Sequence, residues 1–294
     1  MSIWEKYPFS GATAVLFNHA KESEGSRSRL RITPDPGLVN QRLGVRIVGR
    51  PLRNLRASPH STREAERLVS KWKGEARSIS SLSDDALHDA ARYFPLFRDI
   101  LHKENAVAMA VDCQRMPHIA LPFPCLAMFE LYRSGIVTAC EADVNAMLSM
   151  MLLTHLSGKP SFMGNTFPEG SNSVAIDHCV TPTGMADGFD GYRLADRHGD
   201  SSCATAAVDL PPEGPATIAR ISEDLAALHV AVGEVVASHH RGNCRNTLII
   251  RLPHRDVFAE GMVGRHYSVV CSDLSDGLAA WAADVDLNLV LAND

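Results

Sequence analysis

Residues 135–158, GIVTACEADVNAMLSMMLLTHLSG, decide the fold, because a short β-branched apolar run passes directly into a long apolar helix pattern. A buried strand followed at once by a helix is the repeating unit of a parallel α/β sheet. One carboxylate, Glu141, lies where the strand pattern ends and the helix pattern begins. Ligand sites of α/β sheets form at this end of the strands, but an acidic residue is equally typical of a helix start. Position alone leaves both interpretations of Glu141 open.

The residues before this stretch repeat the alternation of strand and helix. Pro95 lies inside the second predicted helix and should kink or break it, and Gly74 should end the first. The pattern predicts an α/β domain with a parallel sheet over residues 43–157. The predicted strands cover residues 43–49, 106–111 and 135–140, and the predicted helices cover 61–73 and 83–103.

The hydrophobic pattern and the composition of the sequence change on both sides of this domain. After Gly158 short β-branched runs alternate with loops rich in Gly, Pro and Asp, which predicts a mainly β C-terminal domain, a barrel or a sandwich, over residues 158–294 with a closing helix at 275–283. Residues 181–202 read as one long polar loop, either a cover over a site or a mobile segment. Residues 1–42 are charged and turn-rich, and we expect an N-terminal extension there.

Composition limits the function classes. The chain has 294 residues, of which 45% are hydrophobic and 21% charged, as in ordinary two-domain soluble proteins. A formal net charge of −5 gives no general reason to bind nucleic acid or a membrane surface, so a small-molecule substrate is expected. The seven cysteines lie mostly in apolar runs and read as reduced thiols, and the N-terminus lacks a signal-peptide pattern. We expect a cytoplasmic protein.

The sequence contains no nucleophile elbow, dinucleotide fingerprint, Walker loop, HExxH helix or CxxC pair. We therefore expect a site assembled from residues that are dispersed along the chain. Asn165 and His178 follow in the segment 158–180, and His266 opens the apolar run HYSVV after a glycine. A single histidine beside a strand is more often a core or surface residue than a ligand. A nucleophilic pair of His178 with Cys179 is not expected, because adjacent strand residues point to opposite faces.

Several ordered segments together resemble the fucose isomerase and arabinose isomerase superfamily, especially its fucose-isomerase-like branch, from about Leu43 onward. The resemblance implies α/β domains followed by a β domain, a homo-oligomer, and aldose–ketose isomerisation through an enediol with a divalent metal, typically manganese. It also implies metal-ligand positions at Glu141, Asn165, His178 and His266, with Glu141 and Asn165 at catalytic positions. The segments are ACEADVNAMLSMMLLTHLSGKPSFMGN, NSVAIDHCVTP, GEVVASHHRGNCRNTLIIRL and GRHYSVVCSD.

Two departures from the family pattern bear on function. Asn165 stands where the family has a second carboxylate, and an amide supplies only a neutral oxygen and cannot act as a base. The first family domain is expected to be absent, with residues 1–42 in its place. The leading hypothesis is therefore an isomerase-like enzyme acting on a sugar or a small polyhydroxy or carbonyl compound. One alternative is a biosynthetic enzyme on the same scaffold that condenses an amine with an aldehyde, as in Pictet–Spengler reactions, and another is a non-catalytic sugar-binding protein.

Overall fold

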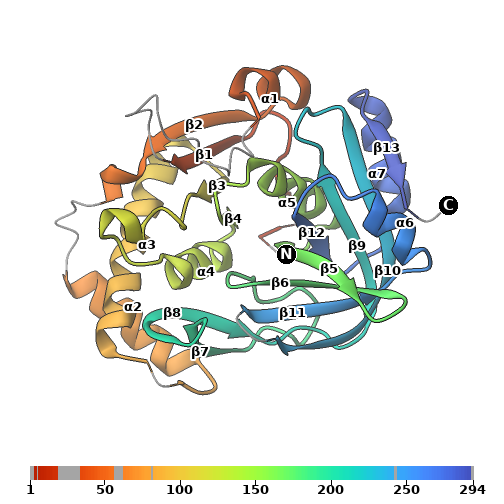
Figure 1. Cartoon of the computed structure of the whole chain (residues 1–294). Coiled ribbons are helices and arrows are strands. Elements are labelled where there is room, and N and C mark those ends of the chain that lie inside the picture. Colours follow the sequence, from red (N-terminus) through yellow and green to blue (C-terminus); the bar gives the residue numbers. More distant parts are fainter. Residues whose placement is uncertain are drawn as a thin grey trace.

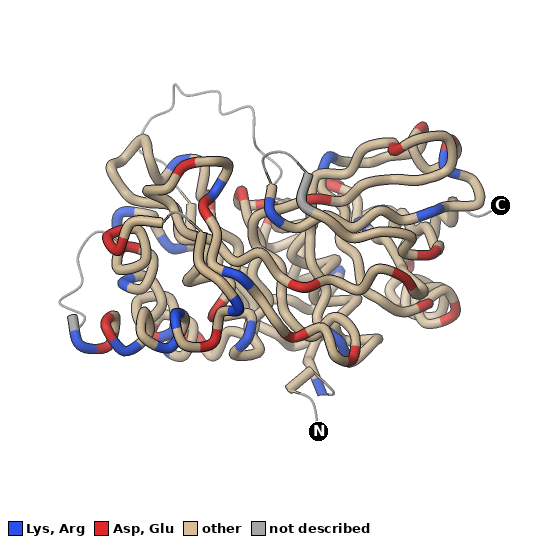
Figure 2. Tube along the Cα trace, turned by 90° about the horizontal axis from the view of Figure 1, so that it is seen from below, with Lys and Arg blue, Asp and Glu red and all other residues tan. Residues whose placement is uncertain are grey.

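The computed structural model describes residues 3–4, 6–18, 34–55, 62–80, 82–241 and 244–292. Its two main parts are a parallel sheet with helices and a mainly β region, which confirms the predicted fold class (Figure 1). No helix within the described residues combines the length and the apolar character needed to cross a membrane. Lys and Arg residues are interspersed with Asp and Glu residues along the chain (Figure 2).

The parallel sheet has the strand order β2-β1-β3-β4, and every neighbouring pair is parallel. Its inner strands are apolar and buried, as expected where helices cover a parallel sheet. The interpretation of residues 1–42 as an extension is wrong for β1, which lies between β2 and β3. The strand was hard to predict because its buried apolar run is only four residues long and because a charged segment of the sequence lies between it and its partner strands. The strands are β1 (Thr13–Asn18), β2 (Arg46–Pro51), β3 (Ala108–Val111) and β4 (Val137–Ala139).

The helices of this part begin and end largely where capping chemistry predicts. Ser83 caps its helix by accepting a hydrogen bond from Ala86 N at 3.1 Å. Pro95 does not interrupt that helix, and Gly74 does not end the preceding one, contrary to the sequence-based expectation. Ser61, the predicted first residue of the preceding helix, lies outside the described residues. The helices are α1 (Pro36–Leu43), α2 (Thr62–Glu75), α3 (Asp84–Glu104), α4 (Cys125–Arg133) and α5 (Val144–Ser157), with short 3-10 turns at Leu52–Leu55 and Pro117–Ile119.

The β region is a closed ring of strands. β10 pairs with β9 along one edge and with β11 along the other, which joins β11-β6-β5-β12-β9-β10 into a barrel, and β13 pairs with the beginning of β10. The barrel strands are β5 (Phe162–Glu169), β6 (Ser173–His178), β9 (Gly214–Ile221), β10 (Ala227–Arg241), β11 (Cys244–Arg251) and β12 (His266–Val270). This region also contains β13 (Asn288–Leu291), α6 (Arg255–Glu260) and α7 (Ser275–Asp284).

Residues 181–202 are not one long loop. They contain β7 (Tyr192–Arg197) and the start of β8 (Asp200–Val208), which form an antiparallel hairpin with a tight turn at His198 and Gly199. Both turn residues have positive φ, at 56° and 83°. The hairpin packs against α2, α3 and α4 on one side and against β11 on the other. The second half of the polar segment, from Tyr192 onward, is therefore a hairpin, and the first half is a loop.

The helix α5 joins the two parts of the molecule. It contacts β3 and β4 of the parallel sheet and β9 and β12 of the barrel, and Figure 1 shows it between them. Its residues are buried continuously from Val144 to Thr154, as predicted for a helix that is apolar on every side. One hydrophobic cluster includes Val111 of β3, Leu148 of α5 and Val230 of β10. The domain boundary between residues 157 and 158 stays a prediction.

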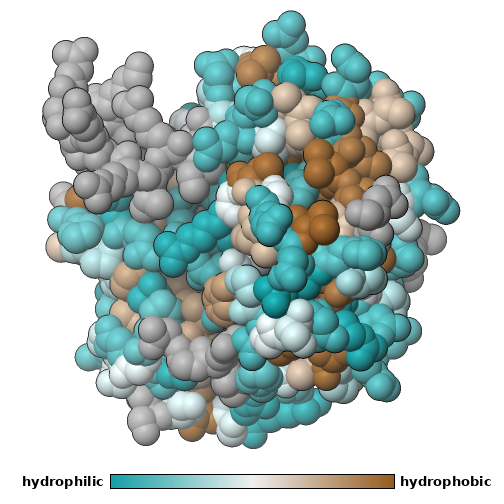
Figure 3. Space-filling view, turned by 45° about the vertical axis from the view of Figure 1, so that its right-hand side comes forward, coloured by the Kyte–Doolittle hydropathy of each residue, from teal (hydrophilic) through white to brown (hydrophobic). Residues whose placement is uncertain are grey.

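Apolar side chains on the surface are few among the described residues, and one area of the face in Figure 3 gathers several of them among polar neighbours. The large apolar side chains with the greatest exposure are Ile3, Ile79, Val236, Val257 and Val290.

Candidate active site

Glu141 lies between β4 and α5 in a backbone conformation that is unusual for a residue with a side chain. Its φ is 57° and that of Ala142 is 56°, so two consecutive non-glycine residues adopt the left-handed region. The helix cap is Asp143, whose side chain accepts a hydrogen bond from Ala146 N at 2.8 Å. The helix-start role therefore belongs to Asp143. The strained backbone places Glu141 ahead of the helix, and such strain is typical of functional sites.

Two histidines from the barrel meet Glu141. The distance from His178 Nε2 to Glu141 Oε1 is 3.9 Å, and that from His266 Nε2 to Glu141 Oε2 is 3.7 Å. One ligand atom from each residue lies within 4.8 Å of the other two. His178 ends β6, His266 begins β12, and Glu141 follows β4, so the cluster lies where the parallel sheet, α5 and the barrel converge.

Asn165, the fourth predicted residue, lies beside this cluster in the sheet. It is the backbone partner of His266 on one side and of Asp177 on the other. Side chains of directly opposed residues in antiparallel strands start on the same face, so the half-buried Asn165 side chain starts beside that of His266. The structure thus groups Glu141, His178 and His266 directly and places Asn165 next to His266. Their roles as ligands or catalysts stay predictions.

A buried ion pair fixes the orientation of His266. His266 Nδ1 lies 2.9 Å from Asp143 Oδ2, and Arg220 Nη1 donates both to Asp143 Oδ2 at 3.0 Å and to the His266 carbonyl at 2.7 Å. Burial alone would raise the pKa of Asp143, but the His266 hydrogen bond and the Arg220 charge lower it below its usual value. An ionised Asp143 only accepts hydrogen bonds, so His266 donates through Nδ1, and Nε2 is the ring nitrogen that faces Glu141.

His178 is held in its neutral form. Burial and the neighbouring His266 lower the pKa of His178 to about 3, so its imidazole is uncharged near neutral pH. A neutral imidazole has a lone pair available to a ligand. Gln114 donates a hydrogen bond to Glu141 Oε1 at 3.1 Å and orients the carboxylate from the parallel-sheet side.

The cluster contains polar atoms without hydrogen-bond partners, which bears on whether a metal fits. Among the described residues, buried His266 Nε2 and His178 Nδ1 have no such partner. Leaving buried polar atoms unpaired is costly, so these atoms call for an explanation such as an ion or a ligand. One carboxylate and two imidazoles are donors that suit manganese, iron or zinc. The donor set and the unpaired His266 Nε2, which faces Glu141, fit the divalent metal that the family resemblance implies.

Three supporting residues were not predicted from the sequence. Asp143 could have been found, because an aspartate before an apolar helix run is a typical cap, although its pairing with His266 has no local signal. Arg220 is completely buried near the end of the mostly apolar strand β9, and nothing near it in sequence indicates its partner. Gln114 lies in a loop after β3 and approaches Glu141 only through the parallel pairing of β3 with β4.

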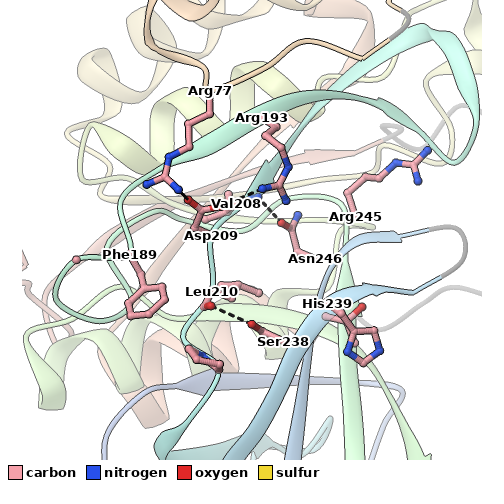
Figure 4. Close-up of a pocket in the computed structure, with 13 residues that line it drawn as sticks. Arg77, Phe189, Arg193, Val208, Asp209, Leu210, Ser238, His239, Arg245 and Asn246 are labelled. Atoms are coloured by element: carbon pink, nitrogen blue, oxygen red, sulfur yellow. Dashed lines mark hydrogen bonds and ion pairs between the residues drawn. The ribbon is translucent and has the colours of Figure 1, made fainter.

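A cavity of about 430 Å³ lies elsewhere, between the β7–β8 hairpin and the barrel strands β10 and β11 (Figure 4). Several cationic side chains line it, but they are paired within the protein. Asp209 binds Arg77 at 2.5 Å and Arg193 at 3.2 Å, while Arg245 pairs with Asp196. This pairing leaves little positive charge for an anionic ligand, so the Glu141 cluster is the stronger candidate site.

Comparisons with known proteins find sugar isomerases that match part of this chain at low sequence identity. The chain is 25% identical over 150 residues to sulfoquinovose isomerase of Alkalicoccus urumqiensis, covering 49% of this chain and 34% of the relative. It is 26% identical over 150 residues to the sulfoquinovose isomerases of Priestia megaterium and Priestia aryabhattai, covering 47% of this chain and 31% of each relative. The matches thus span about a third of the length of these curated relatives. No protein-family model matches the chain.

Proposed function

We propose that the protein is a metal-dependent enzyme of the aldose–ketose isomerase type that acts on a sugar or a related small polyhydroxy substrate. The observation that carries the proposal is the convergence of Glu141, His178 and His266, with His266 Nε2 buried and unpaired among the described residues. The similarity to sulfoquinovose isomerases over 150 residues supports the substrate class. Glu141, His178 and His266 would hold the ion, with the Asn165 amide oxygen as a further donor.

A bound divalent ion would supply polarisation of the substrate carbonyl and hydroxyl oxygens. Glu141 is the carboxylate available to move the proton. It takes the proton from the carbon that bears the hydroxyl group and returns it to the former carbonyl carbon, while the hydroxyl proton passes to the former carbonyl oxygen through an enediol. Gln114 holds Glu141 Oε1 in place, and Asp143 holds the imidazole of His266. The side chains of His178 and His266 are only 6% and 2% exposed, which limits competing water.

Activity with added Mn²⁺ on a panel of aldoses and ketoses that includes sulfoquinovose tests this proposal. The Glu141→Gln variant keeps the size of the side chain and removes the base, so we expect a loss of at least about 100-fold in kcat. His254→Ala is the matched control, because His254 is exposed and its side chain makes no capping hydrogen bond to the helix α6 that follows it. Equal activity of Glu141→Gln and His254→Ala would contradict the assignment of Glu141 as the base.

Asn165 favours a second candidate function, acid/base-assisted condensation of an amine with an aldehyde. The amide stands beside His266 where the family resemblance has a carboxylate, so one fewer group is available for proton transfer. If wild-type protein isomerises none of the sugars and Asn165→Asp gains that activity, the condensation hypothesis is supported. Efficient isomerisation of a sugar by the wild-type protein would reject it.

A further inference from the structure

A second group of metal-ligating side chains lies next to the candidate active site and plays no part in it. Cys179 directly follows β6, His198 lies in the turn between β7 and β8, and Cys244 begins β11. Cys179 Sγ lies 2.9 Å from His198 Nε2, and Cys244 Sγ lies 3.7 Å from the same nitrogen. The two sulfur atoms and the imidazole nitrogen all lie within 4.8 Å of one another.

These separations are close to the coordination geometry of zinc, and one of them agrees with it directly. With Zn–S near 2.3 Å and Zn–N near 2.0–2.1 Å, a tetrahedral ion holds its sulfur and nitrogen ligands about 3.6 Å apart. The Cys244 to His198 distance of 3.7 Å agrees with that value. The Cys179 to His198 distance of 2.9 Å is shorter than that value, so His198 Nε2 would have to move away from Cys179 by about 0.7 Å to reach it. His198 is exposed, which leaves its ring room for that movement.

The backbone around the three ligands is held by other contacts. Thr205 Oγ1 of β8 donates to the Cys179 carbonyl at 2.6 Å, and Arg245 Nε of β11 donates to the Asp196 carbonyl of β7 at 2.8 Å. β6 and β11 are themselves paired, with Asn246 opposite His178. Three separate elements are thus fixed so that two buried thiols and one imidazole converge, which is the preorganisation that a metal site needs.

We propose that Cys179, His198 and Cys244 form a binding site for a zinc-type divalent cation, distinct from the Glu141 cluster. Thiolate and imidazole ligands favour zinc, whereas the carboxylate and imidazole donors of the Glu141 cluster also suit manganese. The exposed side of His198 leaves the fourth coordination position to water. The ion would tie the β7–β8 hairpin to the barrel strands β6 and β11, at the residue that follows His178, and so hold the hairpin in place beside the candidate active site.

Cobalt(II) titration of the reduced full-length protein tests the proposal, because thiolate-to-cobalt charge-transfer absorption arises only from a site with sulfur ligands. We expect this absorption in the wild type and in the Cys271→Ser control, whose buried thiol lies outside the cluster. It should be lost in Cys244→Ser. It should persist in His266→Ala, which removes a ligand of the Glu141 cluster, so failure of the proposed function and failure of this proposal are distinguishable.

His198→Asn keeps the test valid if the cysteine variants do not fold. The position is exposed, and asparagine tolerates the positive φ of 56°. Loss of a residue that hydrogen-bonds a metal ligand typically weakens metal binding 10–100-fold, so loss of His198, which would bind the ion directly, should weaken zinc affinity by at least about tenfold. Absence of the charge-transfer band in the wild type, its survival in Cys244→Ser, unchanged zinc affinity in His198→Asn, or a disulfide between Cys179 and Cys244 in freshly purified protein would overturn the proposal.

Discussion

At the start of α5, two carboxylates lie two residues apart and face different partners. Glu141 faces His178 and His266, with part of its side chain exposed, while Asp143 is 1% exposed and contacts Arg220 and the far nitrogen of His266. The pair resembles the arrangement in which a carboxylate orients a metal-binding histidine from behind. The backbone between the two carboxylates is left-handed at Glu141 and at Ala142.

Asp143→Asn tests the positioning role. Asparagine caps a helix as well as aspartate does, so the change removes mainly the charge. Arg220 would be left buried without its counter-ion, and we expect a loss of about 3–5 kcal/mol in unfolding free energy by chemical denaturation. Metal affinity should fall about 10–100-fold because His266 is no longer held. Asp256→Asn is the control. The side chain of Asp256 is 76% exposed, so this substitution should change the unfolding free energy of the protein by no more than about 0.5 kcal/mol.

The pH dependence of stability tests the environment of His178 in metal-free protein. Its pKa falls from 6.5 to about 3 on folding, so below pH 6.5 the unfolded chain binds a proton that the native protein does not. The contribution of neutral His178 to the unfolding free energy is therefore fully present above pH 6.5, and it is lost progressively as the pH falls toward 3. Besides Glu141, the charged and titratable groups acting on His178 are His266, Arg197, His198 and Asp143.

The measurement is the unfolding free energy between pH 6.5 and pH 5 in the presence of a chelator. Wild-type protein should lose up to about 1.4 kcal/mol per pH unit more than His178→Gln. His254→Gln should keep the wild-type slope, because His254 is exposed. Identical slopes for the wild type and His178→Gln would show that His178 is not held neutral.

At the level of elements, the sequence was most informative where a strand or helix is long and apolar. The strand runs of β3, β4 and β12 and the helix α5 were predicted close to their observed bounds. The inner strand β1 and the β7–β8 hairpin were missed. β1 is stabilised by parallel partners distant in sequence, and the hairpin by packing against α3, α4 and β11. Such tertiary contacts override weak local patterns.

Closure of the barrel depends on a glycine in β10. A methyl group added at Gly233 would lie 2.1 Å from the carbonyl oxygen of Arg251 in β11, so Gly233→Ala should push the two strands apart. We expect a loss of about 1–3 kcal/mol in unfolding free energy, as for other overpacked sites. Gly49→Ala in β2 is the matched strand control, since no atom outside its neighbours lies within 4 Å of the added methyl. Equal stability of the two variants would contradict the predicted close approach.

At the scale of the whole molecule, α5 lies between the parallel sheet and the barrel, and the candidate site forms where they meet. Of the candidate site, Glu141, His178 and His266 were predicted through the family resemblance and converge in the structure. The pairing of Asp143 with Arg220 and the contact of Gln114 with Glu141 were not predicted, because each joins residues that are distant in sequence and leaves no local pattern. Assembly into a homo-oligomer and a cytoplasmic location stay predictions.

Direct titration with Mn²⁺, followed by electron paramagnetic resonance, tests the central claim that Glu141, His178 and His266 hold one divalent metal ion. Manganese prefers oxygen and nitrogen donors, so the Cys179 group should contribute little to its binding. We predict one tightly bound Mn²⁺ per chain in the wild type and in Cys244→Ser, and loss of that binding in Glu141→Gln and in His266→Ala. Absence of bound Mn²⁺ in the wild type, or full binding in both variants, would contradict the account.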